Sequence, residues 1–204
     1  MDLTDHGARV GTAGFVLARL LLEPPSQALA ENFADSEMRT TWPLRDEQSR
    51  AALGSLAADP YEDLPRDHLA MFHRPPRRVA LHESAWRAAA TDPAAVRATL
   101  RGQYERAGLR PLPQDDHVAH QVTLLAHLAA QIGRAAAAGE MTTARAHART
   151  AVQFRAAHLD PMIDPILRGI DEHARTHLYR ALPGLLRGFL TAHTALCAAV
   201  LDPA

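Results

Sequence analysis

The stretch DDHVAHQVTLLAHLAAQIGRAAA, residues 115–137, decides the fold class. Its apolar side chains recur at spacings of three and four residues, at Val118, Val122, Leu125, Leu128 and Ile132. That spacing places them on one face of an α-helix, which must pack against a core. Gly139 stands where the helix should end, because glycine adopts the left-handed conformation that commonly follows a helix. A long amphipathic helix is therefore predicted in the middle of the chain.

The segments on both sides of this stretch also predict helices. Residues 8–23 end before Pro24-Pro25 and carry one stripe of small and apolar side chains, Val10, Gly14, Leu17 and Leu21. Further helices are predicted at residues 26–33, 46–58, 59–73, 93–106, 141–158, 162–175 and 177–201. Residues 74–92 predict an irregular segment, and strand-like alternation stays short throughout. The predicted fold is all-α, a bundle-like arrangement of about ten helices.

Residues 107–113, AGLRPLP, contain a glycine and two prolines, which most often interrupt regular structure. We expect a hinge at 107–114 between an N-terminal helical lobe, residues 1–106, and a C-terminal helical lobe, residues 115–204. Because two copies can exchange lobes through such a hinge, the sequence allows both a monomer and a domain-swapped dimer.

The composition excludes several classes of protein. The chain of 204 residues is 47% hydrophobic and 22% charged, with a formal net charge of −1. Such a balance creates no basic field for nucleic acid or an anionic membrane, and a DNA-binding regulator is correspondingly disfavoured. The single cysteine, Cys197, is predicted to be a buried small apolar residue.

The N-terminal segment lacks the pattern of a secretory signal. It carries Asp2 and Asp5 where basic residues are needed, and Arg19 interrupts its apolar run. No uninterrupted apolar run has the length of a membrane span. We therefore expect a cytoplasmic protein without stable membrane insertion.

Asp115, Asp116 and His117 stand at the start of the central helix. A carboxylate there accepts the unpaired backbone N–H groups and suits the positive end of the helix dipole, so capping is the simplest interpretation. One carboxylate is enough for a cap. The remaining acid and the histidine, beside a flexible linker, could instead hydrogen-bond a cationic peptide.

Two histidine pairs raise the alternative of a helical metal-dependent enzyme. His117 and His120 are one turn apart, and His173 and His177 are separated by four residues, although the latter pair lacks the glutamate of a zinc-protease motif. Chance pairs are expected among twelve histidines, so a metal site is the less favoured interpretation. No nucleophile or phosphate-binding motif is present in the sequence. The acids Asp59, Glu62, Asp63 and Asp67 are most simply a solvated face, or otherwise an acidic rim for an arginine-bearing partner.

Five stretches in order resemble the TorD/DmsD family of dedicated chaperones for molybdenum-containing oxidoreductases, which is related to the NarJ group. They are HLAMF (68–72), HESAW (82–86), LPQDDHVAHQVTLLAHLA (112–129), FRAAHLDPMI (154–163) and HLYRALPGLLRGFL (177–190). The segment PQDDH matches the hinge motif of that family, with its Asp and His on Asp116 and His117. The family pattern also falls on Glu83, Ser84, Trp86, His158, Leu159, Tyr179 and Phe189. The chain departs from the pattern at Ala80, where a proline is usual, and at Met162, where a tryptophan is usual.

The resemblance implies a binding protein with two helical lobes, no catalytic activity and no cofactor of its own. Such chaperones bind the twin-arginine leader and the apo form of a molybdopterin-dependent oxidoreductase, assist cofactor insertion and proofread before export. Carboxylates bind guanidinium groups bidentately, and the acids at positions 62, 63, 83, 115 and 116 are candidates for this role. Asp115 is expected to cap the helix as well. The predicted peptide-binding residues are Asp116, His117, Asp115, Glu83, Ser84, Trp86 and Phe72, with Leu112 as a further apolar contact.

Overall fold

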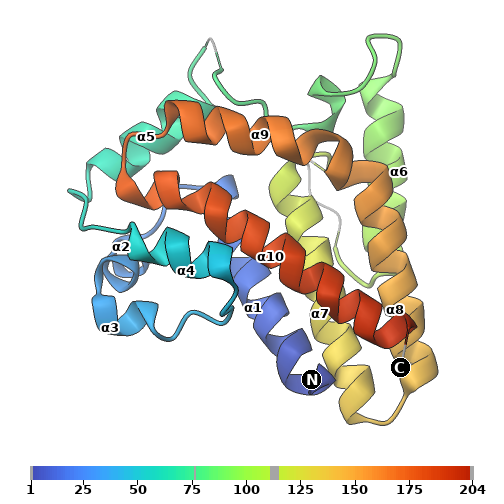
Figure 1. Ribbon diagram of the computed structural model, residues 1–204. Coiled ribbons are helices and arrows are strands. Elements are labelled where there is room, and N and C mark those ends of the chain that lie inside the picture. Colours follow the sequence, from blue (N-terminus) through green and yellow to red (C-terminus); the bar gives the residue numbers. More distant parts are fainter. Residues whose placement is uncertain (1, 76, 111–114, 203–204) are drawn as a thin grey trace.

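The computed structural model describes residues 2–75, 77–110 and 115–202. Within these ranges all regular structure is helical, apart from one isolated antiparallel bridge between His82 and His117 (Figure 1). The helices are α1 (Leu3–Leu22), α2 (Gln27–Ala34), α3 (Ser36–Arg39), α4 (Glu47–Gly54), α5 (Asp63–Phe72), α6 (Pro93–Arg106), α7 (Val118–Ala137), α8 (Met141–Phe154), α9 (Asp160–His173) and α10 (His177–Leu201). A 3-10 turn, η1 (Glu83–Ala85), and a π-helical turn, η2 (Arg155–Leu159), complete the set. The all-α prediction is confirmed.

The helix boundaries differ from prediction where a side-chain cap overrides the apolar pattern. α1 begins at Leu3 rather than at residue 8, because the Asp2 carboxylate accepts the N–H of Thr4 at 2.8 Å and starts the helix early. α6 and α10 have the predicted bounds. α7 ends at Ala137, and Gly139 follows with a φ of 75°, as predicted.

The centre of the fold is the contact between α1 and α7, which run side by side while α10 crosses them (Figure 1). Small residues allow the two backbones to approach closely. A Cβ atom on Gly7 would lie 2.7 Å from the carbonyl oxygen of Ala129 and 2.8 Å from the Cα of Gly133. Because α1 comes from the predicted N-terminal lobe and α7 from the C-terminal one, a single core joins both. The division into lobes stays a prediction.

α10 is long and apolar enough to cross a membrane by length and composition alone, but 56% of its most apolar window is buried inside the protein. Tyr179 and Phe189 are among its fully buried side chains, as a core helix requires. Cys197 is also buried, as predicted, and burial raises the pKa of its thiol to about 11.

The chain passes from α8 to α9 without leaving the helical conformation, whereas the sequence predicts two separate helices. The change of direction lies at the π-helical turn η2 (Figure 1), and Pro161, which has no backbone N–H, stands in the first turn of α9. This turn carries His158, which points toward the candidate site.

Candidate functional site

Two motifs on either side of α6 meet in a feature that we call the clasp, residues 81–84 and 115–118. The N–H of Val118 donates to the carbonyl of Leu81 at 2.8 Å, and the N–H of Glu83 donates to the carbonyl of Asp116 at 2.8 Å. These bonds flank the bridge between His82 and His117. The HESAW and DDH motifs, which are distant in the sequence, therefore form one structural unit.

Asp116 is the polar centre of the clasp. Its carboxylate is buried and accepts the Ser84 hydroxyl at 2.6 Å and the Ser84 N–H at 3.3 Å. Its other oxygen lies 3.1 Å from Nδ1 of His82. Burial raises the pKa of Asp116, but the hydrogen bonds from Ser84 and His82 outweigh it, so that the pKa lies below its ordinary value. Asp116 is therefore an anion held by this chain's own donors.

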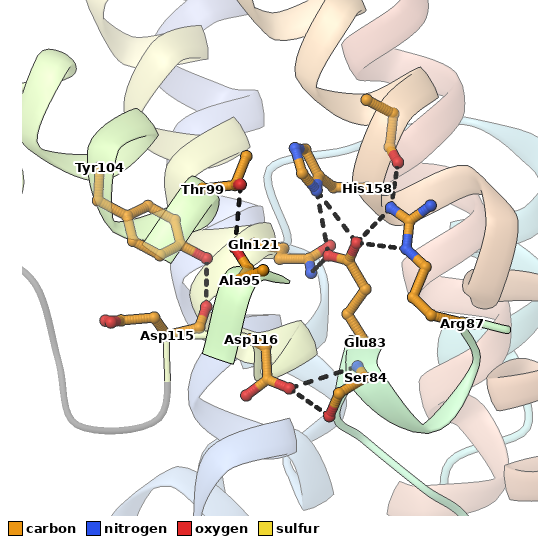
Figure 2. A network of polar contacts seen from close by, with 11 residues as sticks. Glu83, Ser84, Arg87, Ala95, Thr99, Tyr104, Asp115, Asp116, Gln121 and His158 are labelled. Atoms are coloured by element: carbon orange, nitrogen blue, oxygen red, sulfur yellow. Dashed lines mark hydrogen bonds and ion pairs between the residues drawn. The ribbon is translucent and has the colours of Figure 1, made fainter. Parts of the chain in front are cut away.

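Glu83 lies at the centre of a second polar network, which Figure 2 shows together with Asp116. Its buried carboxylate accepts hydrogen bonds from Nε of Arg87 at 2.8 Å and from Nε2 of Gln121 at 2.7 Å. Nδ1 of His158 lies 3.1 and 3.2 Å from its two oxygens. A second nitrogen of Arg87 contacts the same carboxylate. The η1 turn, α7 and the π-helical turn thus meet at one charged group.

Arg87 also links this network to the bend between α8 and α9. Its guanidinium donates to the backbone carbonyl of Ala157. In an α-helix that carbonyl would accept the N–H of the residue four positions later, but Pro161 has none. The guanidinium therefore supplies a donor for a carbonyl that the helix cannot fully satisfy.

Asp115 does not cap α7, and that prediction is wrong. The N-cap is His117, whose Nδ1 accepts the N–H of Ala119 at 3.1 Å. Because the backbone of Asp116 is paired with Glu83, helical structure cannot begin before this point. The buried Asp115 carboxylate instead pairs with the guanidinium of Arg101, two nitrogens of which lie 2.8 and 2.9 Å from it.

The backbone of Asp115 is also held by a hydrogen bond. The hydroxyl of Tyr104 donates to the backbone carbonyl of Asp115 at 2.7 Å (Figure 2). Burial, followed by the nearby carboxylates of Asp115, Glu83 and Asp116, raises the pKa of Tyr104 well above its ordinary range. The phenol thus stays a hydrogen-bond donor, and it fixes the start of the clasp to α6.

His117 is held in the neutral form. Its Nδ1 must be unprotonated in order to accept the Ala119 N–H. Burial, and then the neighbouring rings of His82 and His120, lower its pKa to about 3. The ring of His117 lies 5.0 Å from that of His82 and 5.8 Å from that of His120, measured between centroids. The rings of His82 and His117 meet edge to face, and those of His117 and His120 are tilted against each other.

The aromatic residues of the predicted site occupy different environments. Trp86 is 38% exposed, and its indole N–H donates to the carbonyl of Ala80 at 3.0 Å. Phe72 is buried in the core, where its ring contacts His68 and Tyr179. Leu112 lies outside the described residues.

The prediction of a solvated acidic face is wrong for two of its four members. The buried Asp67 carboxylate accepts the N–H groups of Arg175 and Thr176, both at 2.9 Å. Asp59 accepts the N–H groups of His177 and Leu178, at 3.1 and 3.2 Å. The chain reversal before α10 brings its unpaired backbone donors over α5, and these acids satisfy them.

One histidine of each predicted pair has another role in the fold. Nδ1 of His177 lies 2.9 Å from Asp59, and His117 caps α7. In residues 2–75, 77–110 and 115–202, no three histidine, cysteine or acidic side chains are placed to hold a metal ion. Sequence reasoning did not identify Arg87, Arg101 or Gln121. For Arg87 a signal exists, since it follows Glu83 by four residues.

The sequence that forms this site matches a known protein family. Residues 31–168 match the nitrate reductase delta subunit family, and this span is more than half of the chain. The chain belongs to this family. No protein of curated function matches the sequence.

The delta-subunit family consists of NarJ-type chaperones of redox enzymes, related to TorD/DmsD. Its members assist the maturation of molybdoenzymes and bind a subunit of them, and the family is not a catalytic one. The resemblance drawn from the sequence is therefore confirmed. The matched span covers η1, the clasp and the π-helical turn, and so contains the whole network around Glu83 and Asp116.

Proposed function

We propose that this protein binds the twin-arginine leader and the apo catalytic subunit of a molybdopterin-dependent oxidoreductase in the cytoplasm. It assists insertion of the cofactor and proofreads the enzyme before export. The observation that carries the proposal is the clasp, which gathers Glu83, Asp115 and Asp116 from the two sides of α6. Membership of a chaperone family for molybdoenzymes supports it.

The chemistry of the clasp suits a leader that carries arginine. A carboxylate and a guanidinium form paired, charge-assisted hydrogen bonds, and these strengthen where water is excluded. Glu83 and Asp115 each already bind a guanidinium group of this chain, in each case through one carboxylate oxygen. In our proposal Asp116, His117 and Ser84 hold the two motifs together. Glu83 and Asp115 are thereby kept at a fixed spacing for the guanidinium groups of the leader.

The apolar part of a leader would bind beside the acids. Trp86 follows the Glu-Ser pair and offers an exposed aromatic ring, which is a strong contributor to peptide binding. Phe72 is packed against Tyr179, so a leader would reach it only after α5 had moved away from α10. Micromolar binding corresponds to about −8 kcal/mol, which one aromatic contact and two charge-assisted pairs can supply.

The predicted hinge gives this site a way to open. In our proposal α1 stays packed on α7, and the segment 81–106 moves away from residues 115–118 about 107–114, so that breaking the clasp uncovers all three acids together. The same hinge would allow two copies to exchange lobes, so both monomer and dimer are open to this mechanism.

The test is recovery of the client from the native host with the full-length protein. Tagged wild type, Asp116→Asn and the matched control Asp171→Asn are purified and the bound proteins identified by mass spectrometry. Asp171 is an exposed carboxylate on α9, paired with Arg187. Circular dichroism checks that each variant is folded.

We expect wild type and Asp171→Asn to recover an uncleaved molybdoenzyme subunit, and Asp116→Asn to lose it. Equal recovery by all three proteins would keep the leader-binding function and reject the clasp as its site. If wild type recovers no such subunit from cells that express one, the leader-binding function itself is rejected.

A further inference from the structure

Each of two buried carboxylates at the clasp is occupied by an arginine of this chain. Glu83 is contacted by two nitrogens of Arg87, and Asp115 by two nitrogens of Arg101. In both cases two nitrogens of the guanidinium contact one oxygen of the carboxylate, Oε1 of Glu83 or Oδ2 of Asp115. The chain thus contains two seats for guanidinium, which we call the Glu83 seat and the Asp115 seat.

The two arginines differ from their partners in exposure. The side chain of Arg87 is 31% exposed and that of Arg101 is 52% exposed, whereas those of Glu83 and Asp115 are 2% and 0% exposed. Each arginine therefore reaches inward from a partly exposed position to a buried acid. We expect an arginine to be able to leave its carboxylate toward solvent, because its side chain is already partly exposed.

Arg87 gives up its hydrogen bond to the Ala157 carbonyl when it leaves, but the segments that carry the two arginines are otherwise placed for such an exit. Arg87 stands at the end of the η1 segment and precedes the non-helical, exposed stretch 88–92. Arg101 projects from α6, and its anchor to the clasp is through Asp115. Neither arginine belongs to the tightly packed contact between α1 and α7.

The two seats are connected to each other by one peptide bond and one backbone hydrogen bond. Asp116 directly follows Asp115, and its backbone carbonyl accepts the N–H of Glu83 at 2.8 Å. Figure 2 shows Asp116 between the Glu83 network and the Tyr104–Asp115 contact. We therefore expect one peptide segment with two neighbouring arginines to address both seats, since Glu83 is hydrogen-bonded to the residue that follows Asp115.

We infer that Arg87 and Arg101 are resident occupants, and that a client peptide with two neighbouring arginines binds by exchanging its guanidinium groups for them. This inference rests on the proposed function and specifies how that site recognises its ligand. The exchange keeps each buried carboxylate paired, and so avoids the heavy penalty of an uncompensated buried charge. Lysine cannot take over, because an ammonium does not reproduce the two-nitrogen contact.

The resident arginines also make binding conditional. A peptide must displace them, so its apparent affinity is its intrinsic affinity multiplied by the fraction of protein in which the seats are vacant. Net binding is favourable only for a client that makes further contacts, for instance with Trp86, because the exchange of one arginine for another contributes little free energy. The exchange therefore discriminates between a complete leader and an isolated arginine pair.

Calorimetric titration tests the exchange with a synthetic peptide that carries Arg-Arg before a leucine-rich run, and with its Lys-Lys counterpart. The proteins are full-length wild type, Arg87→Ala, Arg101→Ala and the control Arg66→Ala. Arg66 pairs only with Asp63, and both side chains are largely exposed. We expect Arg87→Ala and Arg101→Ala to bind the Arg-Arg peptide about tenfold more tightly than wild type. Arg66→Ala should bind like wild type, and the Lys-Lys peptide should gain nothing.

A direct readout comes from the Nε–H NMR signals of the arginines in wild-type protein. On addition of the Arg-Arg peptide, the signals of Arg87 and Arg101 should move toward the position of free arginine. The signal of Arg155, whose Nε donates to Asp160 at 2.7 Å, should stay in place as an internal control. This measurement decides the question even if an alanine variant fails to fold.

The outcomes separate the exchange from the function on which it rests. If wild type binds the Arg-Arg peptide while the Arg87 and Arg101 signals do not move, the exchange is overturned and the proposed function stands. Weaker binding by folded Arg87→Ala and Arg101→Ala has the same meaning, because the arginines would then support the site. If wild type binds neither peptide, the proposed function fails together with the exchange.

Discussion

The α1–α7 contact and the clasp both join distant parts of the chain, but by different physics. The first is a steric fit of small residues, in which Gly7 and Gly133 allow the backbones of the two helices to come into direct contact. The second is a set of buried charges, in which Glu83 and Asp116 are held by donors from several elements. A steric fit depends on shape and admits one partner, whereas a charged pair can exchange one donor for another of the same chemistry. We therefore expect the fold to be fixed in the first region and open to exchange of donors in the second.

The largest effect is expected where the fit is broken. Gly7→Leu would place a side chain against the backbone of Ala129 and Gly133, which can only be accommodated by separating α1 from α7. We expect a loss of about 4 kcal/mol in the free energy of unfolding, measured by urea denaturation. The control is Gly102→Ala on α6, whose added Cβ meets only the flexible end of Arg106; it should be neutral or stabilise by up to about 1 kcal/mol. A mild effect of Gly7→Leu would show that the contact is not a unique fit.

The next effect is expected at the centre of the charged network. Glu83→Gln keeps the shape of the side chain but leaves Arg87 and His158 without their anionic partner. We expect destabilisation of about 3 kcal/mol in the same denaturation experiment. Glu23→Gln, which alters an exposed pair with Arg19, should change stability by less than about 0.5 kcal/mol. Equal effects of the two substitutions would contradict the view that the clasp is held by buried charge.

An intermediate effect is expected from pH, because the clasp contains a buried neutral histidine. The pKa of His117 is lowered to about 3 by burial and by His82 and His120, from 6.5 when unfolded. As the pH falls below 6.5, the unfolded chain binds this proton and the folded chain does not, so stability is lost from that point down toward pH 3. At about pH 5 this amounts to about 2 kcal/mol.

His117→Asn isolates this contribution. Asparagine is a favourable N-cap, so the hydrogen bond to Ala119 can be kept while the titrating ring is removed. We expect wild type to lose about 2 kcal/mol more than the variant between about pH 7.5 and about pH 5, measured by thermal unfolding. Parallel pH profiles for the two proteins would mean that His117 takes up its proton without loss of the clasp.

The smallest effect is expected from a single neutral donor. Ser84→Ala removes the hydroxyl that donates to Asp116 at 2.6 Å, while the Ser84 backbone N–H and His82 remain. We expect a loss of about 1 kcal/mol in unfolding free energy and a higher pKa for Asp116, because a hydrogen bond to its charged form is gone. NMR titration of the carboxyl carbon measures the second quantity. An unchanged pKa would show that burial and His82 alone set it.

Sequence reasoning succeeded where the determining signal is local. The bounds of α6 follow from Asp92, which caps its first turn, and from Pro93, which suits the first helical position. The length of α10 follows from a continuous apolar pattern. The family was recognised from short motifs, above all DDH and HESAW, and the comparison confirms it.

The roles of individual acids were less predictable, because each depends on a partner far away in the chain. Asp115 has the position of a helix cap in the sequence, but Arg101 binds it and His117 caps the helix instead. Asp67 was predicted to be solvated and is buried beneath the start of α10. No periodicity in the sequence could have indicated these partners, which are brought together by the folding of separate helices.

The sequence by itself determined the class of fold, most of the helices, the burial of Cys197 and the family, since these depend on spacing along a few turns of chain. Only the tertiary structure decided that the HESAW and DDH motifs pair, that His158 reaches Glu83 from a π-helical turn, and that two arginines of the chain occupy the predicted acidic site. The physical reason is the range of the forces involved. Helix formation is governed by neighbours three and four residues apart, whereas a buried charge takes its partner from whichever element the fold brings within hydrogen-bonding distance.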